Sequence, residues 1–221
     1  MRLSTAARSE ASILETNKVL RNTYLLLSMT LLFSAAMAAV SMVLNLPHPG
    51  LIITLVGYFG LLFLTTKFSN SALGIGFVFA LTGFMGMTLG PILNMYVQAF
   101  SNGHQLILTA LGGTGVIFLG LSAYALTTRK DFSFMAGFLM VGVLVAFFAG
   151  LAAIVFSVPA LTLAVSAMFI LLMSGMILFQ TGEIIHGGET NYIMATVSLY
   201  VSLYNLFTSL LQLLGVFGGD D

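Results

Sequence analysis

Apolar residues form four long stretches in this chain, separated by short polar segments. Residues 22–66, 68–128, 132–182 and 190–219 carry no Lys, Arg, Asp or Glu, and these stretches are 45, 61, 51 and 30 residues long. A helix that spans a bilayer needs about 20 predominantly apolar residues. Read as two, two, two and one spans, the four stretches predict seven membrane-spanning helices.

Polar and helix-breaking residues set the predicted ends of these helices. The segment Pro47-His48-Pro49-Gly50, for example, is a turn that no helix can traverse. We predict spans near residues 24–46, 51–66, 72–96, 105–127, 132–157, 160–185 and 192–217. Residues 1–22 are polar and of mixed charge, with too little apolar surface to fold alone. We therefore expect a flexible cytoplasmic tail, 1–22, ahead of one all-α membrane domain, 23–221.

The basic residues predict the orientation, because Lys and Arg in short loops favour the cytoplasmic side. If seven spans are drawn, all basic residues fall on one side: Arg2, Arg8, Lys18, Arg21, Lys67, Arg129 and Lys130. The N-terminus is then cytoplasmic and the C-terminus periplasmic. Six spans with a re-entrant last segment would instead place the C-terminus inside. The charges leave this alternative open, because no Lys or Arg flanks the last segment.

Composition excludes several classes of protein. With 59% hydrophobic and only 6% charged residues, against about 25% charged in soluble domains, the chain cannot cover a water-soluble surface. A net charge of zero gives no reason to expect a nucleic-acid partner, and the absence of Cys excludes disulfides and thiolate sites. The sequence contains neither a metalloprotease HExxH motif nor a phosphate-binding GxxxxGK[ST] loop, and the three His lie far apart. We expect no catalytic residue, no metal and no cofactor.

Polar residues recur in the last two predicted helices. In the seventh, Ser198, Ser202, Asn205, Ser209 and Gln212 follow one another at steps of four, three, four and three, which places them on one helix face. Such a face avoids lipid. It serves either as interhelical hydrogen-bonding contact, worth about 0.6 kcal/mol per bond, or as the lining of a cavity or ion path. The candidate lining residues are Gln180, Glu183, Ser198, Ser202, Asn205 and Ser209, and the candidate cytoplasmic gate residues are His186 and Glu189.

Glycines in the third predicted helix indicate close packing. Gly86 and Gly90 form a small-xxx-small pair, which lets two helices approach closely. A seven-helix bundle has many internal contacts between helices, so we interpret this pair as internal packing rather than as an oligomer contact.

Several segments resemble a known family. The segment His186-Gly187-Gly188-Glu189-Thr190-Asn191-Tyr192-Ile193, continued by Ala195-Thr196, Leu199-Tyr200 and Asn205-Leu206-Phe207, resembles the C-terminal signature of the Bax inhibitor-1 family. Residues 121–133 form a second similar block, and 18–24 and 90–94 resemble more specifically its bacterial YccA branch. The resemblance covers essentially the whole chain and implies a seven-transmembrane-helix bundle of the Bax inhibitor-1 type.

The resemblance also implies a function. Members of the YccA branch associate with the membrane-anchored FtsH protease and its HflK–HflC companions in the bacterial inner membrane, as modulators and slowly degraded substrates. We add the hypothesis that the tail, with Arg2, Arg8, Lys18 and Arg21, is the handle that the protease engages.

Other branches of the family resemble pH-sensitive calcium leak channels gated by two aspartates. By motif position these aspartates correspond to Gln180 and Ser202 here, and this sequence departs from the pattern at both. An amide and a hydroxyl cannot supply the charge that a divalent cation favours. A cation leak is therefore the alternative function, and a scaffold protein without transport is the third.

Overall fold

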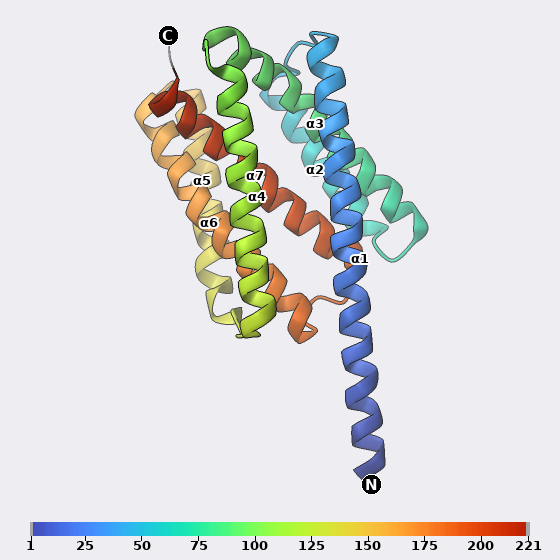
Figure 1. Ribbon diagram of the computed structural model, residues 1–221. Coiled ribbons are helices and arrows are strands. Elements are labelled where there is room, and N and C mark those ends of the chain that lie inside the picture. The colour runs from blue at the N-terminus through green and yellow to red at the C-terminus, as the bar shows by residue number, and fades with distance from the viewer. Residues whose placement is uncertain (1, 220–221) are drawn as a thin grey trace.

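A computed structural model describes the backbone of residues 2–219 and the side chains of residues 14 and 16–219. All regular secondary structure in this part of the chain is helical (Figure 1). The elements are α1 (Arg2–Val43), α2 (Leu51–Lys67), α3 (Ala72–Ala99), α4 (Gly103–Thr128), the short 3₁₀ helix η1 (Ser133–Met135), α5 (Ala136–Val155), α6 (Pro159–His186) and α7 (Tyr192–Gly218). Six of these helical segments are long and apolar enough to cross a bilayer, and α2, with 17 residues, is a shorter apolar helix. The chain is thus an all-helical membrane protein.

The first helix differs from the prediction. α1 begins at Arg2 and continues without a break to Val43, so the boundary expected at residue 22 does not coincide with a helix end. The part of α1 that is apolar enough to span a membrane begins at Thr16. The reason is that residues 2–22 contain neither Gly nor Pro and are rich in Ala, Leu, Arg and Glu, all good helix formers. Low hydrophobicity predicted a separate tail, but helix propensity allows one continuous helix.

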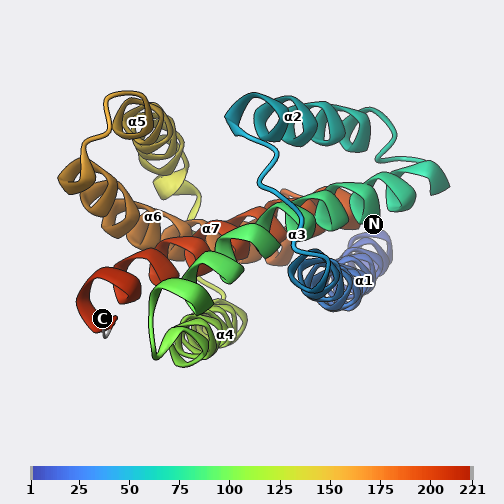
Figure 2. The same cartoon turned by 90° about the horizontal axis from the view of Figure 1, so that it is seen from above.

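α7 lies at the centre of the bundle. It packs against α1, α3, α4 and α6. Figure 2 shows α2 and α5 on one side of the layer that contains α7, and α1 and α4 on the other side. Large side chains of α7, including Leu199, Tyr200 and Leu206, are almost completely buried. α7 therefore carries its polar residues inside the protein, as the predicted stripe required.

Glycines bring α3 against α1. Gly86 and Gly90 face Ser34 and Ser41 of α1, where a Cβ atom would collide with the backbone carbonyl of Ser34 or with the Ser41 side chain. This confirms that the small-xxx-small pair serves internal packing.

A serine hydroxyl stabilises α3 where proline interrupts its hydrogen bonds. Pro91 has no N–H to donate to the carbonyl of Met87, one turn earlier. Ser41 Oγ of α1 donates to this carbonyl oxygen at 2.8 Å. As a result α3 continues through Pro91 to Ala99, three residues beyond its predicted end.

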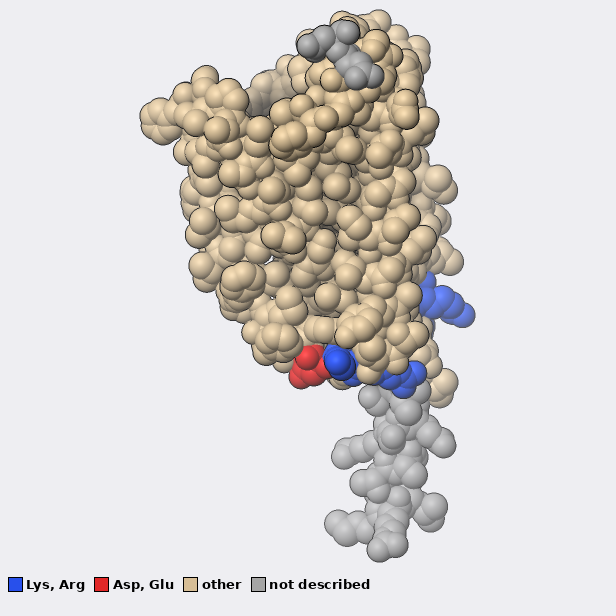
Figure 3. All heavy atoms as spheres, turned by 60° about the vertical axis from the view of Figure 1, so that its left-hand side comes forward, with Lys and Arg blue, Asp and Glu red and all other residues tan. Residues whose placement is uncertain are grey.

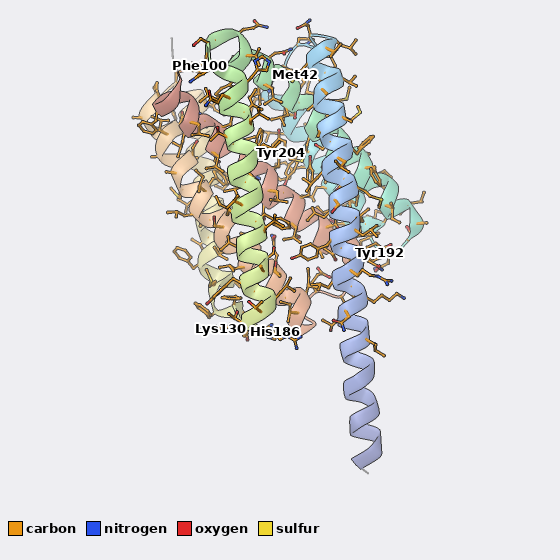
Figure 4. The ribbon with its side chains drawn as sticks, viewed as in Figure 1. Met42, Phe100, Lys130, His186, Tyr192 and Tyr204 are labelled. Atoms are coloured by element: carbon orange, nitrogen blue, oxygen red, sulfur yellow. The ribbon has the colours of Figure 1, made fainter. Side chains whose placement is uncertain are left out.

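Charged side chains gather at one end of the molecule. Figure 3 shows the Lys, Arg, Asp and Glu side chains in view at the end from which the N-terminal part of α1 emerges. Lys130 and His186 lie at this end, and Met42 and Phe100 lie at the other (Figure 4). α7 is one uninterrupted helix of 27 residues. A re-entrant segment would require a break in the helix, so the structure does not support that alternative.

Candidate functional site

A cavity of about 670 Å³ lies between α2 and α5 and reaches inward to α6 and α7. α2 packs on α3, and α5 packs on α6, so the two helices form opposite walls of the cavity. Between these walls the rings of Phe59 and Phe147 approach each other edge to face, with 6.1 Å between their centroids. Phe59 lines the cavity and is also exposed, so the cavity reaches the outer, apolar surface of the bundle beside this ring pair.

Polar side chains form the floor of this cavity. Four of the six predicted lining residues contribute to it: Gln180, Ser198, Ser202 and Asn205. Ser202 Oγ lies 3.1 Å from Gln180 Oε1 and 3.1 Å from the backbone carbonyl oxygen of Ser198, and its single hydrogen serves either acceptor. The contact with Gln180 connects α7 to α6. The amide of Asn205 donates to the carbonyl oxygen of Val201, one turn earlier, at 2.8 Å. Gln180 is only 9% exposed.

The floor has an unused hydrogen-bond donor. The contact with Ser202 occupies one polar atom of the Gln180 amide, and no other hydrogen bond to this amide is found among the residues that the structure describes. A side-chain amide carries two N–H donors and one acceptor oxygen. Whichever of its two polar atoms faces Ser202, Gln180 therefore keeps at least one N–H that can bind an acceptor inside the cavity.

The walls consist of residues that the sequence did not single out. Aromatic rings and methionines line them, among them Tyr58, Phe59, Phe84, Phe147, Phe148, Phe169, Met85, Met173, Met176 and Met194. Tyr204 joins the lining from α7 and lies near the middle of the bundle (Figure 4). Its position one turn after Tyr200, beside the polar stripe, is the sequence signal that could have identified it. The aromatic residues of α2 and α5 carry no such signal, because these helices are apolar on all faces.

Two predicted lining residues lie elsewhere. Glu183 is outside the cavity, near the C-terminal end of α6, where its backbone carbonyl accepts hydrogen bonds from the N–H groups of Gly188 and Glu189 at 2.8 and 3.2 Å. Ser209 is buried on α7 but does not line the cavity. Gln212, further along the stripe, accepts a hydrogen bond from Ser166 Oγ at 2.6 Å. The stripe is thus divided between cavity lining and contact between helices.

The predicted gate residues hold the connection between α6 and α7. His186 places its two ring nitrogens 2.9 Å from the carbonyl oxygen of Gly182 and 3.0 Å from that of Arg129, at the end of α4. Glu189 accepts a hydrogen bond from the backbone N–H of Asn191 at 2.7 Å. Asn191 in turn caps α7 by accepting from the N–H groups of Ile193 and Met194. Both predicted residues therefore stabilise loops outside the cavity.

Of the four predicted tail residues, Lys18 and Arg21 are exposed on α1. The side chains of Arg2 and Arg8 lie outside the described residues. Within the described part of the chain, no group of three His, Cys, Asp or Glu could hold a metal ion.

Comparison with known proteins gives the family. The sequence profile of the family described as "Inhibitor of apoptosis-promoting Bax1" matches residues 16–219. The chain is 57% identical to the Escherichia coli K12 protein named "Modulator of FtsH protease YccA", over 99% of each chain. This chain belongs to the Bax inhibitor family. It is also 57% identical to the "Inner membrane protein YccA" of E. coli O6:H1 over 99% of each chain, and 56% identical to an uncharacterized Pseudomonas aeruginosa protein over 94% and 93% of the two chains.

Within the Bax inhibitor fold, the two positions that the resemblance assigns to gating aspartates are in direct contact. They are Gln180 and Ser202, whose side chains share a hydrogen bond of 3.1 Å. Two carboxylates at this distance would share a proton or repel each other. An amide and a hydroxyl do neither, so this Bax inhibitor family member joins α6 to α7 with an uncharged hydrogen bond.

Proposed function

We propose that this protein modulates a membrane-anchored FtsH protease in the bacterial inner membrane by restraining its action on other membrane proteins. The observation that carries the proposal is the 57% identity to the E. coli modulator over 99% of both chains. The alignment includes 219 residues and therefore all seven helices of this structure. No helix that could contribute to the interaction is absent from the alignment.

The length of α1 supports a role in engaging the protease. Its 42 residues correspond to about 63 Å at 1.5 Å per residue, roughly twice the 30 Å thickness of the hydrocarbon core. Figure 1 shows the N-terminal part of α1 extending well beyond the other helices. We propose that this extension lies in the cytoplasm and is the segment that the protease engages, and that the seven-helix bundle slows extraction from the membrane.

The proposed topology has seven spans, with the N-terminus in the cytoplasm and the C-terminus in the periplasm. α2 contributes the shortest span, because its 17 residues extend about 26 Å. This length lies at the lower limit of membrane-spanning helices. Charged residues at the end from which α1 emerges support the cytoplasmic assignment of that end.

Reconstitution with the protease tests the function. Purified FtsH would be placed in liposomes with a model membrane substrate, with and without the full-length chain, and degradation would be followed over time. We expect co-purification with FtsH and slower degradation of the substrate when the chain is present. Deletion of residues 2–13 should weaken both effects, whereas Gly76→Ala, at an open position on α3, should leave both unchanged. Substrate degradation at the same rate with and without the chain would refute the proposal.

The same preparation separates the other proposals. Repeating the co-purification with HflK and HflC present would test whether these proteins join the complex. Calcium flux into the liposomes tests the cation leak, which the uncharged floor of the cavity does not favour.

Cysteine labelling tests the topology, because the chain contains no Cys of its own. His104→Cys and Lys130→Cys place single thiols on exposed residues at opposite ends of the bundle. A membrane-impermeant maleimide added to intact cells should label the first variant and not the second. The reverse pattern would invert the proposed orientation, and labelling of both would refute it.

A further inference from the structure

The cavity between α2 and α5 is polar at its floor but contains no charge. Within the part of the chain that the structure describes, its lining includes no Lys, Arg, His, Asp or Glu. A charged ligand inside the membrane would have no partner there, at a cost of several kcal/mol. The floor instead offers the amide hydrogens of Gln180 and the hydroxyl of Ser198. These groups favour an uncharged ligand with a hydrogen-bond acceptor.

The polar floor extends from near the interface to the middle of the membrane. Gln180 lies six residues before the end of α6 at His186, and Ser198 lies six residues after the start of α7, so both are about 9 Å from the helix ends. Asn205 is 13 residues into α7, at about 20 Å. Phospholipid ester and head groups remain near the interface. A ligand that fills the floor as far as Asn205 must therefore carry a polar group that enters the hydrocarbon layer.

The size of the cavity is that of a small-molecule site. Its volume of about 670 Å³ lies within the range of roughly 300–1,000 Å³ that is typical of ligand sites. Along α2 the lining extends from Thr54 to Thr66, a length of about 18 Å.

We propose that this cavity binds an isoprenoid quinone that enters from the bilayer between α2 and α5. The flat quinone ring would stack among the aromatic rings of the wall, with Gln180 Nε2 donating a hydrogen bond to a ring carbonyl oxygen. The isoprenoid chain would lie against the methionines and leave through the opening beside Phe59 and Phe147. The site is a binding site only, and the proposal goes beyond protease modulation and does not depend on it.

Fluorescence quenching tests this proposal, because the chain contains no Trp and an introduced Trp is the only indole. Phe147→Trp places the indole in the cavity wall, and Leu119→Trp places it on a lipid-exposed position of α4 outside the cavity. Decylubiquinone, added to each full-length variant in micelles, should quench the first Trp with saturation. It should quench the second only in proportion to its concentration in the micelle. Equal, unsaturated quenching of both would refute the site.

A second pair of variants tests the role of the amide. In the Phe147→Trp background, Gln180→Leu should weaken decylubiquinone binding about tenfold, the effect of losing one hydrogen bond. Ser209→Ala, a change on α7 outside the cavity, should leave the affinity unchanged. If Gln180→Leu does not fold, 1-bromododecane gives the same test on the intact floor, because it quenches indole but has no carbonyl. Saturable quenching by bromododecane at the same affinity would overturn the role of the acceptor.

Discussion

The contact between α1 and α3 makes a sharp prediction about stability. Gly86 lies against Ser34, and a Cβ atom at this position would lie 2.9 Å from Ser34 Oγ and still closer to its backbone carbonyl oxygen. Backbone cannot rotate away as a side chain can, so Gly86→Ala must push α1 and α3 apart. The displacement also affects α7, because Ser34 Oγ shares a hydrogen bond of 2.6 Å with the hydroxyl of Tyr200. We therefore expect Gly86→Ala to destabilise the bundle.

The expected size follows from two opposing effects. Overpacking of this kind costs about 1–3 kcal/mol, while replacing Gly by Ala inside a helix gains up to about 1 kcal/mol. Gly76, on the same helix, provides the matched control, since a Cβ atom there meets nothing within 4 Å. Gly76→Ala should be neutral or slightly stabilising. The helix gain is common to both variants, so their free energies of unfolding should differ by the overpacking cost of about 1–3 kcal/mol, or roughly 5- to 150-fold in the unfolding equilibrium.

Unfolding in mixed micelles measures this difference. Each variant would be titrated with sodium dodecyl sulfate, and the loss of near-ultraviolet circular dichroism from tyrosines such as Tyr200 would report the separation of the helices. The midpoint for Gly86→Ala should fall below the midpoint for Gly76→Ala. Equal midpoints would show that close approach of α1 and α3 contributes little to stability.

Two further predictions concern the loops that follow α4 and α6. Asn191→Ala removes the cap of α7 and the hydrogen bonds from Asn191 to Ser69 and Asn70. Hydrogen exchange of the amides in the first turn of α7 should then become faster by the equivalent of about 1–2 kcal/mol. Unchanged protection of these amides would contradict the capping role of Asn191. The backbone N–H of Ser133 donates a hydrogen bond to the Asp131 carboxylate at 2.8 Å, and this hydrogen bond lowers the pKa of the Asp131 carboxyl group. The hydrogen bond therefore stabilises the loop fully above the usual pKa of about 3.9, and this stabilisation is lost as the pH falls through the lowered pKa. Protection of the Ser133 amide against hydrogen exchange should decrease below about pH 4 in this chain but not in Asp131→Asn, and equal pH profiles would refute this.

Sequence alone predicted the ends of most helices because they are marked by strong local signals. α1 ends at Val43, three residues before the end predicted from Pro47, Pro49 and Gly50, and α2 begins at Leu51 as expected. The start of α1 was missed because the prediction weighed hydrophobicity, whereas a helix without Gly or Pro can continue through polar residues. Helix breakers were thus better guides than apolar content.

The floor of the cavity could be predicted, but its walls could not. The spacing of Ser198, Ser202 and Asn205 placed them on one face, and in a membrane such a face avoids lipid. Phe59 and Phe147 lie on helices that are apolar all round, where periodicity does not show which face packs inward. Likewise, the glycines of α3 indicated close packing without indicating that α1 is the neighbour. Which helices meet depends on the whole bundle rather than on any one segment.

The uncharged contact between Gln180 and Ser202 also bears on how this protein responds to pH. Two aspartates at these positions would change their charge over an accessible pH range, and the separation of α6 and α7 would change with it. An amide and a hydroxyl keep the same charge from acid to alkaline conditions, so the hydrogen bond between them holds α6 to α7 throughout. Asp131 lies in the loop after α4, and Glu183 and His186 lie in the last turn of α6. A pH-dependent change in this chain should therefore begin at this end of the bundle and leave the cavity floor intact.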